Sequence, residues 1–371
     1  MRFLLALFWI GFTASLPAQE YYLFVGTYTS GKSKGIYVYR LNEKTGELST
    51  VSHTDTASNP SFLVPSPNGN YLYAVNENAG TRSGSVSAYA FDKSTGTLHL
   101  LNQVPTGGDD PCHVSITRNG KWLTVANYSG GSLAVFPIRP DGSLQPFVQL
   151  IRHQGKSVNP ERQEKAHVHA SFFSPDEKIL LATDLGMDEV SVYPFRQDLG
   201  KPLQTKGAHV IKIHPGGGPR HLCFSPDNKF LYIMEEMGGS VDVYQYQHGN
   251  TVFLQRIASH PPDYPGQPGS ADIHISPDGK FLYASNRGNE NNIAIFAVLP
   301  DGRLKAAGYQ SADGNGPRNF MIDPEGNFLL VANQQTNNIV VFRRNKEDGS
   351  LQPTLQQVNV PNPVCLKILY P

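Results

Sequence analysis

Three observations predict an all-β protein built as a seven-bladed β-propeller. A strand–turn–strand unit recurs six times along the chain of 371 residues. Further strand-like runs follow each unit, and four antiparallel strands per repeat of about 50 residues make one propeller blade. The two chain ends each supply part of a seventh unit. No segment has the 3.6-residue periodicity of an amphipathic helix, so we expect very little helix.

The repeated unit centres on a turn of the S-P-D-G-K type. Proline, aspartate and glycine favour tight turns, and the flanking runs are rich in Tyr, Leu, Val and Phe, which favour strands. Successive units are separated by 51, 57, 51, 51 and 47 residues. The first turn residues are Ser66, Thr117, Ser174, Ser225, Ser276 and Asp323. This regular spacing indicates one continuous architecture rather than several domains.

The chain ends are expected to complete the seventh blade. Residues 362–371, NPVCLKILYP, resemble the first strand NPSFLVPSP but have no partner strand after them. The segment from Tyr21, YYLFVGTYT, starts with a second-strand sequence and lacks a first strand. Pairing these segments closes the ring and removes the free strand edges of an open ring. We therefore expect a single domain over residues 20–371, closed by N- and C-terminal segments that share one blade.

The first residues predict an export signal. Arg2 precedes an apolar run from Phe3 to about Thr13, and small or turn-forming residues end at Ala18. The run is too short to cross a bilayer and has the layout of a secretory signal peptide; a buried N-terminal strand is the alternative. We expect residues 1–19 to be removed and the mature chain to be exported, periplasmic or secreted, without a membrane span.

Charge and cysteine content argue against several classes of protein. The 31 basic and 31 acidic residues give a formal net charge of zero and form no Lys/Arg-rich run, so a nucleic-acid partner is not expected. Cys112, Cys223 and Cys365 are too few and too widely spaced for a disulfide framework or a CxxC metal motif. Small buried side chains are the expected role of all three. We expect a monomer with no cofactor.

Equivalent positions of the six units form rings around the central channel, because the first strand of each blade lines it. Five residues before the turn lie Ser61, Cys112, His169, Arg220, Ala271 and Arg318. Ten residues after it lie Asn76, Asn127, Asp184, Glu235, Asn286 and Asn333, and one position further on lie Glu77, Tyr128, Leu185, Glu236, Arg287 and Gln334. The two strands run antiparallel about the turn, so all three rings are expected at one mouth of the channel.

These polar rings leave several interpretations open. The Asn-rich ring favours structural hydrogen bonds to neighbouring loops. The charged residues would converge either as a substrate site or as a solvated ion-pair network. His167 and His169 lie on the same side of a strand near Asp184, which makes a metal site a weaker alternative, and no metal is expected. Hydrogen-bonded channel residues are the expected role of His113, His221 and His274.

Several segments resemble the seven-bladed lactonase family. They are HVHASFFSPD, GPRHLCFSPDNKFLYIMEE, HISPDGKFLYASNRG, the N-terminal FVGTYT and the GPR that contains Arg318. The similarity covers essentially the whole mature chain. The family includes the propeller-type bacterial 6-phosphogluconolactonase and the fungal carboxymuconate cyclase. The resemblance implies a site at the channel mouth whose histidine, glutamate and two arginines fall by position on His169, Glu236, Arg220 and Arg287.

The resemblance implies hydrolysis of a sugar-type lactone that is expected to be anionic. Glu236, assisted by His169, would activate the attacking water, while Arg220 and Arg287 would bind the substrate anion and stabilise the oxyanion. Further substrate contacts are expected from Arg318, Glu235, Tyr128 and Asn286. Two alternatives remain open: a lactonising enzyme of the carboxymuconate cyclase type, and a secreted propeller that binds a ligand without turnover.

Two local features add to this prediction. The longest repeat holds a polar loop over residues 151–167, IRHQGKSVNPERQEKAH, which leads into the strand of His169 and is expected to overhang the mouth. Glu235 occupies a position that is Asn or Asp in the other units. Two carboxylates this close would raise the pKa of one of them or require an arginine neighbour.

Overall fold

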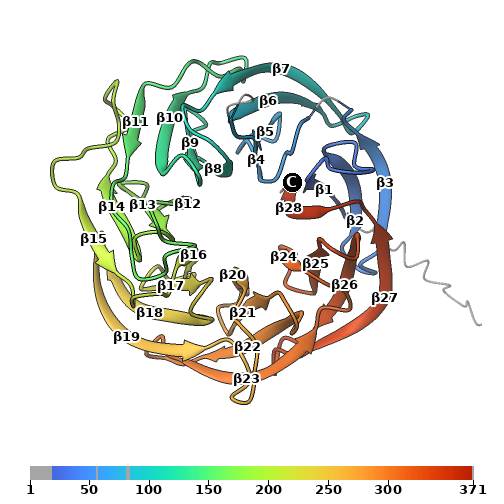
Figure 1. The fold of residues 1–371 in the computed structure, drawn as a ribbon. Coiled ribbons are helices and arrows are strands. Elements are labelled where there is room, and N and C mark those ends of the chain that lie inside the picture. The colour runs from blue at the N-terminus through green and yellow to red at the C-terminus, as the bar shows by residue number, and fades with distance from the viewer. Residues whose placement is uncertain (1–18, 56, 81–83, 370–371) are drawn as a thin grey trace, which may run out of the picture.

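The computed structural model describes residues 19–55, 57–80 and 84–369, and Figure 1 shows these as a ring of seven sheets. Each sheet has four strands, and every strand pair is antiparallel. The described residues contain no helix. The seven-bladed propeller predicted from the repeat is therefore confirmed. Residues 1–18, most of the predicted signal peptide, lie outside the described residues.

The chain ends share one blade, as predicted. This sheet has the order β28–β1–β2–β3, so the last strand pairs with the first. Leu366 lies opposite Val25 and Ile368 opposite Leu23, and the four side chains are buried. The bounds are β28 (Pro363–Leu369), β1 (Glu20–Thr27), β2 (Tyr37–Asn42) and β3 (Leu48–His53). Closure within one chain leaves no blade incomplete.

The other six blades follow the chain from the centre of the ring to its rim (Figure 1). Their innermost strands are β4 (Leu63–Pro65), β8 (Pro111–Ile116), β12 (Val168–Phe173), β16 (Pro219–Phe224), β20 (Ser270–Ile275) and β24 (Pro317–Ile322). The second strands are β5 (Tyr71–Asn76), β9 (Trp122–Asn127), β13 (Ile179–Asp184), β17 (Phe230–Glu235), β21 (Phe281–Asn286) and β25 (Phe328–Asn333).

The third strands are β6 (Ser85–Asp92), β10 (Ser132–Pro137), β14 (Glu189–Pro194), β18 (Ser240–Gln247), β22 (Asn292–Val298) and β26 (Asn338–Arg344). The outermost strands are β7 (Thr97–Pro105), β11 (Gln149–Arg152), β15 (His209–Lys212), β19 (Asn250–Ala258), β23 (Leu304–Ser311) and β27 (Leu351–Asn359). Second strands are almost entirely buried and outermost strands are largely exposed. The apolar core therefore lies between neighbouring blades.

The repeated turn closes the inner hairpin through its own side chains. In the blade of β16 and β17, Ser225 donates from Oγ to Asp227 and accepts a hydrogen bond from the backbone N–H of Phe230. The fourth turn position has a positive φ, 62° at Asn228 and 71° at Gly279, which Asn and Gly adopt most readily. The motif is therefore scaffold, and it places each hairpin in the same register.

Tyrosines of the second strands tie neighbouring blades together. The hydroxyls of Tyr73, Tyr232 and Tyr283 each donate to a glycine carbonyl in the outer turn of the next blade, at 3.0, 3.0 and 2.8 Å. Those glycines belong to the D-G turns that the sequence repeat predicted. Since each tyrosine is completely or almost completely buried, these bonds also satisfy hydroxyls that would otherwise be unpaired.

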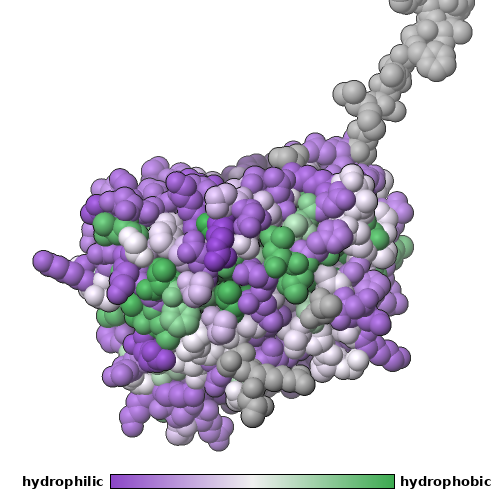
Figure 2. Space-filling view, turned by 90° about the horizontal axis from the view of Figure 1, so that it is seen from above, coloured by the Kyte–Doolittle hydropathy of each residue, from purple (hydrophilic) through white to green (hydrophobic). Residues whose placement is uncertain are grey.

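The side of the ring that faces the viewer in Figure 2 is mostly hydrophilic. Hydrophobic residues there form separate patches among polar ones. Among the described residues, no helix is long and apolar enough to cross a membrane. Cys112 and Cys365 are buried and Cys223 is half-buried, and all three are free thiols.

Candidate active site

Register shifts in the innermost strands occur at the first ring of polar residues. The ladders of β12, β16 and β24 are interrupted at His169, Arg220 and Arg318, and those of β8 and β20 at the equivalent positions. A β-bulge leaves a residue unpaired and re-aims its side chain. The β-bulge thus falls at the equivalent strand position in five blades. It directs these side chains to one end of the channel. We call this end the charged mouth.

Glu236 is the centre of the charged mouth. It follows β17, and its Oε2 lies 2.9 Å from Nε of Arg220 and 3.2 Å from Nη2 of Arg287. Nε2 of His169 lies 3.8 Å from the same oxygen. The four residues assigned by position therefore meet around one carboxylate. They come from three successive blades.

The two arginines differ in their exposure. Arg220 is 3% exposed, and its Nη1 also donates to the backbone carbonyl of Ala271 at 2.6 Å. Arg287 is 20% exposed and donates to the carbonyls of Gly269 and Ser270 from Nε and Nη2. Nη1 of Arg287 has no acceptor among the described residues. Arg220 is therefore a buried support of Glu236, and Arg287 reaches the solvent.

A third arginine, which the ring positions could not reveal, comes from the loop over residues 151–167. Nη2 of Arg162 lies 2.8 Å from Oε1 of Glu236 and 3.2 Å from the hydroxyl of Tyr128. The buried Gln163 next to it anchors the loop through Asp188 and the carbonyl of Leu185. The loop overhangs the charged mouth, as predicted. The signal available in the sequence was the extra length of this repeat, which does not identify the arginine.

The charges around Glu236 keep it ionised. Burial opposes ionisation, but Arg287 and Arg220 hold the pKa of Glu236 well below its usual value. Burial and the charge of Arg220 lower the pKa of His169 well below its ordinary value, so this imidazole is neutral. The contact between His169 and Glu236 is consequently not an ion pair.

A second group of residues lies at the same mouth. Arg318 donates from Nη2 to the hydroxyl of Tyr28 at 3.0 Å, and this hydroxyl donates to Oε1 of Glu77 at 2.8 Å. Ser61 donates to the other oxygen of Glu77. Arg318 interacts with the carboxylates of both groups. Burial lowers the pKa of Arg318, whereas the charges of Glu77 and Glu236 both raise it. The predicted position of Arg318 on the basic side of the site is therefore supported.

Two predicted binding residues have other partners. Glu235 is 1% exposed and contacts Arg256 at 2.9 Å and Ser240 at 2.6 Å. Burial and the nearby Asp242 raise the pKa of Glu235. Adjacent strand residues point to opposite faces, which separates this carboxylate from Glu236. The required arginine neighbour exists, but it is Arg256 of the outermost strand β19, which is 33% exposed and lies away from the charged mouth.

Asn286 has a structural environment, as the ring of amides suggested. It donates to the carbonyl of Ser259 at 2.7 Å and accepts from the hydroxyls of Ser259 and Ser270. Asn76 and Asn333 donate to loop carbonyls in the same way. The structure does not bring Glu235 or Asn286 into contact with the cluster around Glu236.

The residues considered for a metal site are engaged elsewhere. His167 stacks on Tyr128 with ring centroids 4.5 Å apart and contacts Glu164 at 3.2 Å. Asp184 accepts hydrogen bonds from the backbone of His167 and binds His153 at 2.8 Å. In the part of the chain that the structure describes, no group of three or more His, Cys, Asp or Glu is arranged to hold a metal ion.

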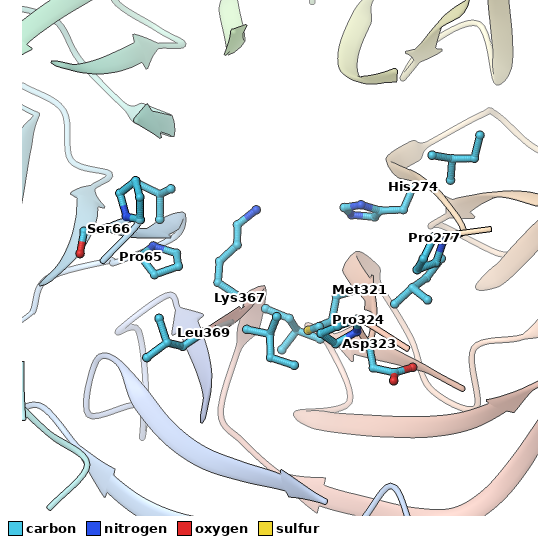
Figure 3. A pocket seen from close by; sticks show the side chains of 15 residues that line it. Pro65, Ser66, His274, Pro277, Met321, Asp323, Pro324, Lys367 and Leu369 are labelled. Atoms are coloured by element: carbon cyan, nitrogen blue, oxygen red, sulfur yellow. The ribbon is translucent and has the colours of Figure 1, made fainter. Parts of the chain in front are cut away.

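A cavity of about 630 Å³ lies at the opposite end of the channel. We call this end the turn mouth. Residues at or beside the repeated turns, including Ser66, Pro277 and Asp323, line it together with apolar side chains. In Figure 3, Lys367 and His274 reach into the open space while the Asp323 carboxylate points away. The carboxylate that lines this cavity, Asp323, forms no ion pair with an arginine among the described residues. We therefore place the candidate chemistry at the charged mouth and not at this cavity.

The fold and the site define a propeller that gathers arginines around a buried carboxylate at one mouth of its channel. Comparison with known families assigns residues 22–368 to the family described as "Lactonase, 7-bladed beta-propeller". The chain belongs to this lactonase family, which confirms the resemblance drawn from the sequence.

Relatives with similar sequences and structures cover almost the whole chain. A 6-phosphogluconolactonase of Formosa agariphila is 41% identical over 341 residues, covering 91% of this chain and 96% of its own. The crystal structure of a putative 6-phosphogluconolactonase of Bacteroides fragilis is 44% identical, with a TM-score of 0.90 and coverage of 95% and 98%. The periplasmic gluconolactonase PpgL of Pseudomonas aeruginosa is 40% identical, with a TM-score of 0.89 and coverage of 95% and 99%.

Proposed function

We propose that the protein is a lactonase that hydrolyses a sugar-type lactone at the charged mouth. The observation that carries this proposal is the ionised carboxylate of Glu236 beside arginines that still have free N–H groups. Among the described residues, Nη1 of Arg287 and both Nε and Nη1 of Arg162 have no acceptor. A carboxylate that can accept a proton thus lies next to donors that can bind an anion.

Hydrolysis starts with water attack on the lactone carbonyl. Glu236 accepts the proton of the attacking water, and the carbonyl oxygen becomes an oxyanion as the carbon turns tetrahedral. The free N–H groups of Arg287 are the donors for this oxyanion, since such groups stabilise charge that develops in the transition state. His169, neutral and 3.8 Å from Glu236, borders the same carboxylate and helps to position the water.

Substrate binding makes Glu236 a stronger base. In the free protein three arginines hold its pKa low, which makes it a weak base. An anionic substrate that binds Arg162 and Arg287 competes with Glu236 for their charge. The pKa of the carboxylate then rises toward its ordinary value, because fewer positive charges favour its ionised form. Binding and base activation are coupled in this way.

The charge balance favours an anionic substrate. Four guanidinium groups, those of Arg162, Arg220, Arg287 and Arg318, face the two carboxylates of Glu77 and Glu236. The cluster therefore has an excess of positive charge that a phosphate or carboxylate on the substrate would neutralise. Tyr128, which is hydrogen-bonded to Arg162, offers a ring edge and a hydroxyl to a sugar.

We also propose that the mature chain acts outside the cytoplasm as a monomer. The N-terminal segment has the layout of a signal peptide, and β1 starts at Glu20, just after the expected cleavage site. The similar PpgL protein is described as periplasmic. Export would yield a mature N-terminus between about Ser15 and Tyr21, which N-terminal sequencing of the exported protein would reveal. An intact Met1 in the cytoplasmic fraction would contradict export.

A lactone panel tests the proposed activity. The mature protein is incubated with phosphorylated, carboxylated and neutral lactones, and acid release above the spontaneous rate is followed in a pH-stat. The account predicts faster turnover of the anionic members. Absence of excess acid with every lactone would contradict the proposal and favour a propeller that binds a ligand without turnover.

A further inference from the structure

The charged mouth contains a second buried carboxylate, Glu77, in surroundings unlike those of Glu236. Both residues occupy the same position of their repeats, one residue after the second strand of the blade. Glu236 contacts three guanidinium groups. Glu77 instead accepts hydrogen bonds from the neutral hydroxyls of Tyr28 and Ser61, and no ion pair to it is present among the described residues. The two carboxylates occupy equivalent positions, but the partners of Glu236 are charged and those of Glu77 are neutral.

These surroundings move the two pKa values in opposite directions. Burial raises the pKa of Glu77, and the charge of Arg318 and the two hydroxyls offset this only in part. The arginines lower the pKa of Glu236. In a pair of active-site carboxylates, such a difference separates the group that donates a proton from the group that accepts one.

Tyr28 lies between Glu77 and the arginine side of the mouth. Its hydroxyl donates to Glu77 and accepts from Arg318, which also lies over the Tyr28 ring at 5.5 Å. Burial raises the pKa of Tyr28, so the hydroxyl keeps its proton. When Glu77 is protonated, it donates to the Tyr28 oxygen instead, and the Tyr28 hydroxyl is then free to direct its own proton at a substrate. Glu77 and Tyr28 thus form a path for a proton, with Arg318 holding the hydroxyl in place.

Lactone hydrolysis needs a proton donor as well as a base, because the ring oxygen leaves as an alkoxide. We propose that Glu77, acting through Tyr28, protonates the ring oxygen as the C–O bond of the lactone breaks. This inference rests on the proposed lactonase function. It assigns the protonation of the leaving oxygen to Glu77, which is not among the predicted site residues. Glu236 performs the other half of the reaction, the activation of water.

The proton steps balance. The water oxygen forms a bond to the carbonyl carbon and gives one proton to Glu236. The bond between this carbon and the ring oxygen then breaks, Tyr28 passes its hydroxyl proton to the ring oxygen, and Glu77 replaces that proton on Tyr28. The product is the open hydroxy acid. Glu236 returns its proton to solvent, and Glu77 takes one up before the next turnover.

Leaving-group dependence tests the proposal. A general acid matters for an alkoxide leaving group and much less for a phenoxide, which departs without help. We expect Glu77→Gln to lower kcat about 100-fold or more on an aliphatic sugar lactone, yet less than about 5-fold on the phenolic lactone dihydrocoumarin. Glu236→Gln should lower kcat on both substrates. Glu161→Gln, the same chemical change at an exposed carboxylate of the loop over residues 151–167, is the matched control and should keep the activity on both.

Tyr28→Phe provides a second variant in case Glu77→Gln fails to fold, because it keeps the ring under Arg318 and removes only the hydroxyl. It should show the same selectivity for the sugar lactone. In the wild type, kcat should fall at alkaline pH as Glu77 loses its proton, and this limb should disappear in Glu77→Gln. Equal losses on the two lactones, or near-normal turnover of the sugar lactone by both variants, would overturn the role of Glu77. Inactivity of the wild type on every lactone would instead contradict the lactonase function itself.

Discussion

Arg220 donates from Nε to Oε2 of Glu236 at 2.9 Å, and both side chains are less than 10% exposed. A buried charge is stable only when a partner and hydrogen bonds compensate it. Arg220 also donates to the carbonyl of Ala271, so its position is fixed on both sides. The pair therefore fixes the position of the Glu236 carboxylate, and the more exposed Arg162 and Arg287 are arranged around it.

The first prediction separates the two arginines of the blades. Arg287→Ala should lower kcat on both kinds of lactone, because it removes the oxyanion donor, and it should lower kcat/KM for an anionic lactone about 10- to 100-fold further, the worth of one charge-assisted hydrogen bond. Arg220→Ala should lower kcat on both substrates and also reduce stability, because it leaves Glu236 with one buried partner fewer. Steady-state kinetics with paired lactones measure the difference. Identical profiles for the two variants would contradict the division of roles.

The second prediction concerns the loop over residues 151–167. Arg162→Ala removes a cation from Glu236 and a binding group for the substrate, so KM for an anionic lactone should rise about 10-fold. Glu161→Ala, a change at the exposed neighbouring residue, is the control and should leave KM unchanged. If Arg162→Ala matched the control, the loop would only cover the mouth without taking part in binding.

The third prediction concerns stability at acid pH. Burial lowers the pKa of His113, His169 and His221, to about 4 for His221. Below about pH 6.5 the unfolded chain binds protons that the folded chain does not, so stability is full above this pH and is lost as pH falls toward about 4. The three imidazoles together contribute up to about 4 kcal/mol per pH unit to this slope, and the raised pKa values of the buried Glu77 and Glu235 oppose it.

Urea unfolding between about pH 7 and about pH 5 measures this slope. His113 packs between Phe62 and Phe172, so His113→Phe keeps an aromatic ring there and removes one titrating group. Compared with the wild type, the variant should show a slope smaller by up to about 1.4 kcal/mol per pH unit. An unchanged slope would show that His113 is protonated in the folded state.

The fourth prediction concerns ring closure. Deleting residues 361–371 removes β28 and exposes the edge of β1, along with its buried partners such as Leu23 and Val25. Several buried side chains are lost at once, so the free energy of unfolding should fall by more than about 5 kcal/mol. Calorimetry of the mature and truncated chains checks this. Melting temperatures within about 2 °C of each other would contradict closure by β28.

The sequence predicted the fold well because every blade repeats one hairpin with the same turn chemistry. The turn requires hydrogen bonds at Ser225 and Asp227 and a positive φ at Asn228, and all three are present. This residue pattern can be counted in the sequence without a structure. The site followed from the same count: residues such as His169 and Arg220, far apart in the chain, occupy one position of the repeat and therefore meet at one mouth.

The rest of the site depends on features that the repeat does not encode. Arg162 lies in a loop whose path is set by Gln163 and Asp188, so no periodic position identifies it. Glu235 and Glu236 are neighbours in sequence, yet strand geometry turns the first toward Arg256 and the second toward the channel. The β-bulges that direct the inner side chains toward the mouth also cannot be predicted from the composition of the strands.

Catalysis by Glu236 is the central claim, and Glu236→Gln tests it most directly. The amide keeps the size of the side chain and removes the base, so kcat should fall by about 100-fold or more for anionic and neutral lactones alike. The assay is a pH-stat measurement of kcat on both substrates, with thermal unfolding to verify the fold. A folded Glu236→Gln variant with near-normal kcat would contradict the account and would transfer the role of base to another residue of the charged mouth.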